Sequence, residues 1–241
     1  MKAVVLAGGK GTRLAPFTTV IPKPLMPIGD MPILEVMLRQ MKRAGVDEVI
    51  LAIGHLGQLL RAFFGDGSQY GLRISYSIEE HPLGTAGPLA LIDGLDEPFL
   101  VVNGDTLTML DLAEFMSFHH RSGAVATIAL SKRLVNIDLG VVQLNEDEAV
   151  VGYVEKPKYE FQASMGIYMF EPRVLKYIPG GEYFDFPTLV LRLLEAGEDV
   201  AGYRFEGYWK DLGRPEDYEQ AVADYERMRG DFLGVPETVK L

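Results

Sequence analysis

Near the N-terminus the sequence reads Ala3-Val4-Val5, followed directly by Leu6-Ala7-Gly8-Gly9-Lys10-Gly11-Thr12-Arg13-Leu14. This order predicts a buried strand that ends in a glycine-rich turn carrying an arginine. Glycines have no Cβ and adopt positive φ, so backbone amides in such a turn can close around an anion. The Arg13 guanidinium adds a planar set of donors that suits phosphate oxygens. The alternative interpretation is a tight connection from strand to helix with no ligand.

This glycine turn differs from the two common phosphate-binding loops. A dinucleotide-binding Rossmann loop needs a third glycine where Leu14 stands, and a Walker loop needs Gly-Lys-Ser or Gly-Lys-Thr where Gly9-Lys10-Gly11 stands. No acidic residue follows about 20 positions later in the context that a ribose contact needs. An oxidoreductase that binds a nicotinamide cofactor is therefore disfavoured.

Composition is that of an ordinary globular protein. The 241 residues are 48% hydrophobic and 24% charged, and they include no cysteine, which excludes disulfides and thiolate metal sites. No apolar run approaches the ~18–20 residues of a membrane span, and the start of the chain does not resemble a signal peptide. We expect a cytoplasmic protein with no membrane partner.

The net charge of −11 argues against a nucleic-acid partner, because binding a phosphate backbone needs an extended basic face. If the glycine turn binds a polyphosphate, an acidic protein must supply cations locally. Arg13, Lys23 and Lys156, all beside glycines or prolines, are the candidates. A divalent metal held by aspartates would add further positive charge.

The order of predicted elements favours an α/β protein. Short β-branched strands alternate with amphipathic helices in the first half, which predicts a Rossmann-like, doubly wound, mainly parallel mixed sheet with helices on both faces. Strands predominate later, which predicts antiparallel additions at the sheet edge or a small antiparallel lobe over the site. We expect one catalytic domain over residues 1–230 and a tail over 231–241. The predicted helices are one from Ile33 capped by Asp30, one over Thr85–Leu95, one over Asp111–Arg121 that opens with a capping box of Asp111 and Glu114, and a closing helix over Pro215–Arg227. The predicted strands include Glu48–Ile53, Arg73–Ile78, Phe99–Asn103, Val125–Leu130, Gly166–Phe170 and Val200–Phe205.

Further motifs lie between these predicted elements or at their ends. Pro22-Lys23-Pro24 holds a lysine on a rigid, extended mount, although a solvated surface turn is the alternative. Asn103-Gly104-Asp105 ends the most apolar strand, where α/β sheets bind ligands and where an aspartate suits Mg²⁺. Leu83-Gly84-Thr85-Ala86-Gly87-Pro88 is a small-residue turn that lets a flat base approach the backbone, or merely packs tightly. The stretch Trp209-Lys210-Asp211-Leu212-Gly213 places another aspartate beside the only tryptophan, whose indole we expect to pack within the loop.

Together and in this order, the motifs resemble those of the sugar-1-phosphate nucleotidylyltransferases, and the likeness spans essentially the whole chain. The matching residues are Gly8-Gly9-x-Gly11-Thr12-Arg13-Leu14, Pro22-Lys23-Pro24, Leu83-Gly84-Thr85-Ala86-Gly87, Gly104-Asp105, Glu155-Lys156-Pro157 and Trp209-x-Asp211-x-Gly213. The resemblance implies a Mg²⁺-dependent enzyme that transfers a nucleotidyl group from a nucleoside triphosphate to a sugar 1-phosphate and releases pyrophosphate. Such an in-line transfer needs alignment and charge neutralisation more than an acid or a base.

The same resemblance assigns residues to roles. Arg13, Lys23 and Asp105 would be catalytic, Arg13 on the leaving pyrophosphate and Lys23 on the α-phosphate or the sugar phosphate, and Asp105 with Asp211 would bind Mg²⁺. The nucleotide site would comprise Leu6, Ala7, Gly8, Gly9, Gly11, Thr12, Arg13, Lys23, Glu79, Gly84, Thr85 and Ala86, with Gly87 also lining the base pocket. The sugar-phosphate site would comprise Gly104, Gly140, Glu155, Lys156, Ser164, Gly166 and Trp209.

Two departures from the family pattern bear on function. Ser164-Met165-Gly166 stands where members often carry Asn-Ala-Gly, which leaves the contact to the sugar hydroxyls in doubt. The hexapeptide-repeat β-helix of longer members is missing, so we expect no acetyltransferase activity. The turn at 83–88 and the 207–213 segment look most like mannose-1-phosphate and heptose-phosphate guanylyltransferases, which implies GTP as donor. A thymidylyl- or uridylyltransferase acting on glucose 1-phosphate, and a catalytically silent regulatory subunit that binds nucleotide sugars, are the alternatives; a homo-oligomer is compatible with each.

Overall fold

The computed structural model describes residues 1–234, and its centre is a seven-stranded sheet. Strand β11 runs antiparallel to both of its neighbours, and the other strand pairs in this sheet are parallel. The predicted mainly parallel mixed sheet is confirmed. In spatial order the strands are β12 (Val200–Phe205), β8 (Ala126–Asn136), β11 (Lys158–Phe170), β6 (Phe99–Asn103), β1 (Lys2–Ala7), β4 (Glu48–Ile53) and β5 (Arg73–Ile78).

The first strand, β1, lies in the middle of the sheet. Val4 pairs with Ile50 of β4 on one side and with Val101 of β6 on the other. Its apolar run has no polar alternation because both faces are covered, as is usual for a parallel strand. Ala3 and Val5 pack into one core cluster and Val4 into another. The glycine turn therefore begins at the centre of the sheet's carboxyl edge, where the strand order reverses and α/β proteins bind ligands.

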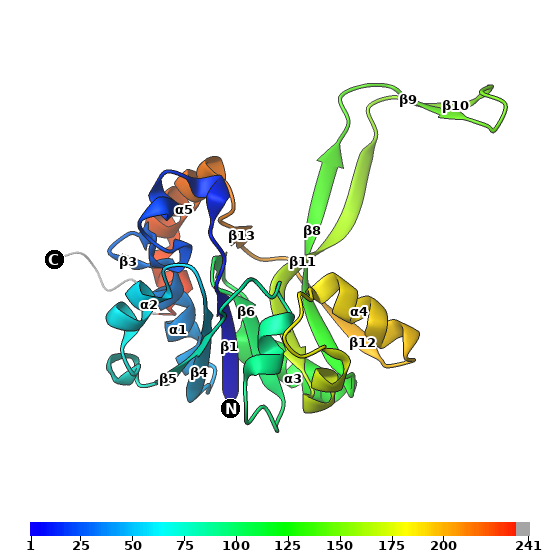
Figure 1. Cartoon of the computed structure of the whole chain (residues 1–241). Helices are drawn as coiled ribbons and strands as arrows, with labels where there is room; N and C mark the ends of the chain where they lie inside the picture. Colours follow the sequence, from blue (N-terminus) through cyan, green and yellow to red (C-terminus); the bar gives the residue numbers. More distant parts are fainter. Residues whose placement is uncertain (235–241) are drawn as a thin grey trace.

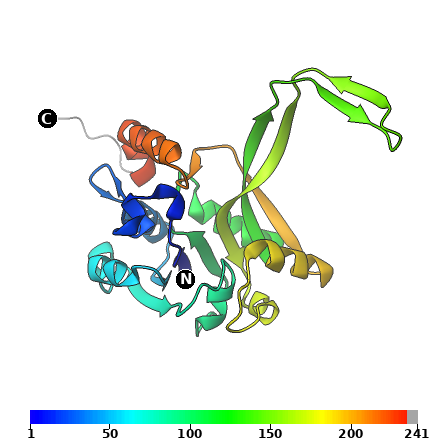
Figure 2. The same cartoon turned by 45° about the horizontal axis from the view of Figure 1, so that its top comes forward.

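Helices cover both faces of the sheet, as predicted (Figures 1 and 2). One core cluster packs α1 (Ile33–Arg43), α2 (Gly57–Phe64) and α3 (Leu112–Ser122) against the sheet. The opposite cluster contains α4 (Phe186–Glu195) and the short 3-10 helices Gly87–Leu91 and Pro172–Tyr177. The final helix, α5 (Pro215–Leu233), belongs to a third cluster that includes Leu14 and the β2 (Pro27–Ile28) and β3 (Met31–Pro32) hairpin.

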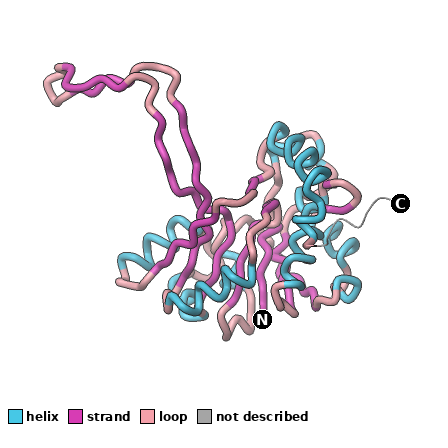
Figure 3. The backbone as a smooth tube through the Cα atoms, turned by 180° about the vertical axis from the view of Figure 1, so that it is seen from behind, coloured by secondary structure: helices cyan, strands magenta, loops and turns pink. Residues whose placement is uncertain are grey.

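Strands β8 and β11 continue beyond the sheet as a two-stranded arm. They pair without interruption from Ser131–Ala163 to Asn136–Lys158, and the arm ends in the hairpin of β9 (Val141–Leu144) and β10 (Val150–Val154). Figures 1 and 3 show the arm projecting away from the body. This is the antiparallel lobe that the sequence predicted, but it is larger, because both strands extend past the predicted bounds.

Three local expectations were wrong. The predicted helix over Thr85–Leu95 is an irregular turn followed by the 3-10 helix Gly87–Leu91. Asp30 does not cap α1, because Pro32 holds that position and the Asp30 carboxylate pairs with Arg229 at 2.7 Å.

The closing helix also differs from its predicted bounds. It runs to Leu233 rather than Arg227, and Phe232 within the predicted tail is fully buried in the third core cluster. The remainder of that tail, 235–241, lies outside the described residues. No helix in residues 1–234 is both long enough and apolar enough to span a membrane.

Candidate active site

The glycine turn forms one wall of a cleft at the carboxyl edge of the sheet. Gly11 has φ +61°, and its carbonyl accepts hydrogen bonds from Leu14 N at 2.9 Å and from the Thr18 hydroxyl at 2.8 Å. A Cβ at Gly8 would collide with the Glu79 carboxylate, so a side chain there would displace Glu79. Residues of the turn line the cleft, which encloses about 420 Å³.

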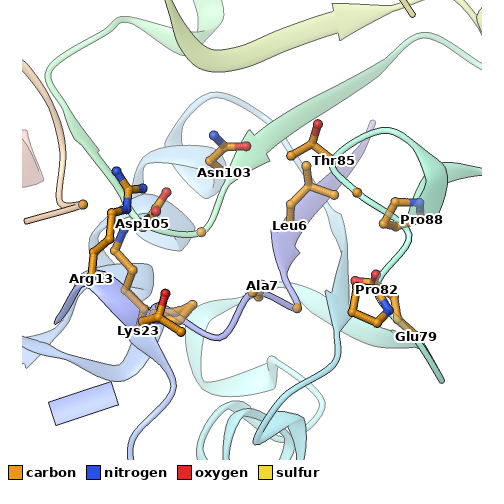
Figure 4. Close-up of a pocket in the computed structure, with 18 of the residues that line it drawn as sticks. Leu6, Ala7, Arg13, Lys23, Glu79, Pro82, Thr85, Pro88, Asn103 and Asp105 are labelled. Carbon is orange, nitrogen blue, oxygen red and sulfur yellow. Dashed lines mark hydrogen bonds and ion pairs between the residues drawn. The ribbon is translucent and has the colours of Figure 1, made fainter. Parts of the chain in front are cut away.

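Cations and carboxylates meet at one end of this cleft (Figure 4). Lys23 is 8% exposed, its ammonium donates to Asp105, and it lies 3.6 Å from the Asp211 carboxylate. Arg13 lies beside them, because Gly213 has no side chain. A Cβ at Gly213 would come within 3.1 Å of the Arg13 guanidinium. Lys23 is thus held in the site and is not a solvated surface residue.

A short strand pair brings Asp211 to Asp105 from the far end of the chain. Strand β13 (Trp209–Asp211) pairs with β7 (Thr106–Thr108) so that Asp211 is opposite Thr106, and Leu212 N donates to the Asp105 carbonyl at 3.3 Å. Burial raises the pKa of Asp211, and the Asp105 charge raises it further, while Lys23 and Arg13 oppose both effects. The two carboxylates therefore feel one another's charge.

These carboxylates fit a magnesium ion that is completed by substrate. In residues 1–234 no group of three or more His, Asp or Glu side chains could hold a metal ion. Mg²⁺ is usually bound by one or two carboxylates together with substrate phosphates and water. The pair of Asp105 and Asp211, with an unfavourable charge interaction between them, matches that requirement.

The opposite end of the cleft is formed by Glu79 and by the turn over residues 82–88 (Figure 4). Leu83 N donates to the Glu79 carboxylate at 3.1 Å, and burial raises the pKa of Glu79. Gly84 has φ +80° and lies against the Phe184 carbonyl, while the Thr85 hydroxyl accepts from Phe186 N at 3.0 Å. Ala86 is fully buried and does not line the cleft, so its assignment to the nucleotide site is not supported by its position. Gly87, assigned to the base pocket, is also buried and does not line the cleft. The other residues assigned to the nucleotide line the cleft, as does Gly104.

Apart from Gly104, the residues assigned to the sugar phosphate divide into two groups, and neither group lines this cleft. Ser164, Gly166 and Trp209 surround a bulge in β11 next to Asn103: the Trp209 indole donates to the Met165 carbonyl at 3.0 Å, and a Cβ at Gly166 would collide with the Asn103 amide. The second group lies where the paired strands β8 and β11 join the hairpin of β9 and β10. It consists of Gly140, which packs against the Tyr153 ring, and of Glu155 and Lys156 between β10 and β11.

Residues 2–228 match the family described as nucleotidyl transferase. The chain belongs to this family. It is 39% identical to mannose-1-phosphate guanylyltransferase of Mycobacterium tuberculosis, covering 93% of this chain and 64% of that protein. It is 35% identical to UTP–glucose-1-phosphate uridylyltransferase of Synechocystis, covering 92% of this chain and 62% of that protein. The chain thus spans less than two thirds of the length of these relatives.

The fold is also that of solved nucleotidyl transferases. A putative glucose-1-phosphate thymidylyltransferase from Bacillus anthracis superimposes with a TM-score of 0.75 at 24% identity, covering 92% of this chain and 94% of that one. The mixed sheet with helices on both faces is therefore the family's architecture.

Several cleft residues of this family member were not singled out from the sequence. Asn103 and Gly213 lie within motifs that had been recognised, so their neighbours could have indicated them. Pro24, Pro82 and Pro88 flank recognised glycines or lysines in the same way. Tyr183 had no such signal, because it reaches the cleft from the loop before α4.

Proposed function

We propose that this protein transfers a nucleotidyl group from a nucleoside triphosphate to a sugar 1-phosphate, with GTP and mannose 1-phosphate or a manno-heptose 1-phosphate as substrates. One observation carries the proposal: the glycine turn, Arg13, Lys23 and Asp105 line a single cleft, and the Asp211 carboxylate lies 3.6 Å from the Lys23 ammonium. That set suits a polyphosphate and a divalent metal. It supports an active enzyme over a silent regulatory subunit, which would have no need of the two carboxylates.

The reaction requires alignment more than proton transfer. An oxygen of the sugar phosphate forms a bond to the α-phosphorus, the bond from that phosphorus to the oxygen bridging to the β-phosphate breaks, and pyrophosphate leaves with that oxygen. Arg13 and the amides of the glycine turn would bind the leaving pyrophosphate. Lys23 has three N–H donors, so it can contact the α-phosphate while it remains paired with Asp105. Such fixed donors stabilise the charge that develops in the transition state.

Magnesium is part of the proposal. Asp105 and Asp211 would hold it, and when bound it would neutralise charge on the reacting phosphates. The protein's own share is to place Lys23 and Arg13 beside Asp211, because their positive charges oppose the rise in its pKa.

Guanine is favoured by the far end of the cleft. The Glu79 carboxylate accepts hydrogen bonds when ionised, and guanine presents two neighbouring donors, N1–H and the 2-amino group. Uracil and thymine present a single N–H on that edge. The guanylyltransferase among the relatives points the same way at 39% identity, against 35% for the uridylyltransferase. We include in the proposal a cytoplasmic location and self-association.

The test is pyrophosphate release from a panel of GTP, UTP, dTTP, ATP and CTP, each with mannose, manno-heptose and glucose 1-phosphates. We expect the highest kcat/KM for GTP with a manno-configured sugar phosphate, and loss of turnover in Lys23→Ala. A preference for UTP or dTTP with glucose 1-phosphate would overturn the choice of substrates but not of reaction. Nucleotide binding with no turnover for any pair would establish the silent subunit.

A further inference from the structure

Tyr183 is the one aromatic residue that lines the cleft in the described part of the chain, and it is 69% exposed. The aromatic residues that follow it are buried and have partners. The Phe184 ring centre lies 4.6 Å from the Arg192 guanidinium carbon, and the Phe186 ring centre lies 4.2 Å from that of Tyr168. Tyr183 is not covered in this way, so a large planar side chain is left open at the cleft.

The backbone on both sides of Tyr183 is fixed to the turn over residues 82–88. The Phe184 amide donates to the Leu83 carbonyl at 2.9 Å, and the Phe184 carbonyl accepts from the Gly87 amide at 2.9 Å. On the other side, the Glu182 carbonyl is so close that a Cβ at Gly87 would lie 2.9 Å from it. Tyr183 is therefore mounted on this turn and does not sit on a free loop.

This mount places Tyr183 at the end of the cleft away from the cations. That end is formed by Glu79 and by the 82–88 turn (Figure 4). Neither supplies a positive charge for a phosphate, whereas Arg13 and Lys23 lie at the opposite end. With the phosphates of a nucleotide held by these cations, its base falls beside Tyr183.

A nucleobase suits an exposed aromatic ring in this position. Every base has a flat π-face that stacks on aromatic side chains. Tyrosine gives a large contact area at a low cost in conformational entropy, because only two side-chain torsions have to be fixed. Hydrogen bonds to a base lie in its plane and stacking is perpendicular to that plane, so an edge contact from Glu79 and a face contact from Tyr183 are compatible.

We propose that the Tyr183 ring stacks on the base of the nucleoside triphosphate. This inference rests on the proposed function and names the residue that covers the face of the base. Because stacking tolerates every base, Tyr183 supplies affinity for the nucleotide, and the choice of base falls to Glu79. Tyr183 is a binding residue in this proposal and takes no part in the transfer itself.

Isothermal titration calorimetry with GTP, in the absence of sugar phosphate, tests the inference. Tyr183→Ala should weaken binding by about 10-fold, which corresponds to about 1.4 kcal/mol, and Tyr183→Phe should bind like the parent protein because it keeps the ring. The control is Leu191→Ala, which removes an exposed apolar side chain of α4 outside the cleft and should change nothing.

Inorganic tripolyphosphate, which has no base, should bind the parent protein and Tyr183→Ala equally. Equal GTP affinities for Tyr183→Ala and Leu191→Ala would overturn the inference. It would also be overturned if Tyr183→Ala weakened GTP and tripolyphosphate alike, or if it raised only KM for the sugar 1-phosphate, which would place the ring on the acceptor sugar.

Nuclear magnetic resonance distinguishes the base from the ribose. Transferred nuclear Overhauser effects should connect tyrosine ring protons with guanine H8 in the parent protein and disappear in Tyr183→Ala; effects confined to ribose protons would contradict the inference. A protein that turns over no substrate pair but shows the expected binding differences would contradict the proposed function and support the Tyr183 contact. An active enzyme with equal GTP affinities in parent and Tyr183→Ala would contradict the contact alone.

Discussion

Replacing Gly84 with alanine should destabilise the protein and weaken nucleotide binding together. At φ +80° an alanine costs about 1 kcal/mol relative to glycine. Its Cβ would also lie 2.5 Å from the Phe184 carbonyl oxygen, which accepts hydrogen bonds from Ala86 N and Gly87 N, each at 2.9 Å. Displacing that carbonyl weakens both bonds, at about 1 kcal/mol each.

The expected loss for Gly84→Ala is therefore about 3 kcal/mol, which lowers Tm by roughly 6–12 °C in a protein of this size. Urea unfolding monitored by circular dichroism measures the free energy of unfolding directly. Because Gly84 also lines the cleft, KM for the nucleoside triphosphate should rise while KM for the sugar 1-phosphate changes less.

Gly123→Ala is the matched control. Gly123 has φ +66° at the end of α3, and a Cβ there would meet nothing within 4 Å. This variant should lose only the conformational cost of about 1 kcal/mol and should keep both KM values. If the two variants lose equal stability, the contact with Phe184 does not constrain the turn and the reasoning is wrong.

Three further predictions concern single side chains. Lys23→Ala should reduce kcat/KM far more than Lys42→Ala, whose ammonium is 3.7 Å from Asp47 on the surface; equal effects would show that Lys23 has no role in the site. Asp105→Ala should lower kcat by about 10²-fold or more with the fold intact by circular dichroism, and the parent enzyme should stop when a chelator is added; full activity in either case would contradict the metal assignment. Burial lowers the pKa of His119 from 6.5, although the Glu171 carboxylate opposes the effect. Since the unfolded chain then takes up a proton more readily, stability is complete above pH 6.5 and declines as the pH falls toward the folded-state pKa. His119→Gln should flatten this decline in urea unfolding, and an unchanged slope would exclude His119 as its source.

Elements with strong local signals were predicted well. Strands β4, β5, β6 and β12 have their predicted bounds, because each is a short apolar or alternating run that ends at a turn residue. The cap of α3 was also correct, since Asp111 accepts from Glu114 N at 3.1 Å. In these elements the secondary-structure propensity, the hydrophobic pattern and the tertiary packing all favour the same structure.

The arm was underestimated because its residues are not buried against a core. A strand is recognised by the alternation that burial of one face imposes. Val135, Leu139, Val151 and Tyr153 are exposed large apolar side chains on the arm, so no such contrast marks where its strands continue. The length of β8 and β11 beyond the sheet is set by their pairing with each other, and the two strands are separate segments of the sequence.

In the site, local motifs could be recognised from their own residues, whereas the meeting of Asp105 with Asp211 was predicted only through the family resemblance. The glycine turn, Lys23 and Asp105 were identified from their own neighbours. The approach of Asp211 to Asp105 depends on three paired residues of β7 and β13, and no pattern within either strand encodes that register.

The departure at Ser164-Met165-Gly166 takes on a different meaning once the fold is known. The Ser164 hydroxyl is 2.9 Å from the Tyr168 hydroxyl and accepts from Gly166 N at 3.3 Å, so it is engaged within the bulge of β11. Gly166 has φ +71°, and its missing side chain makes room for the Asn103 amide. Asn103 lines the cleft from the neighbouring strand. A side-chain amide that both donates and accepts therefore still stands at this edge of the cleft, supplied by β6 rather than by β11.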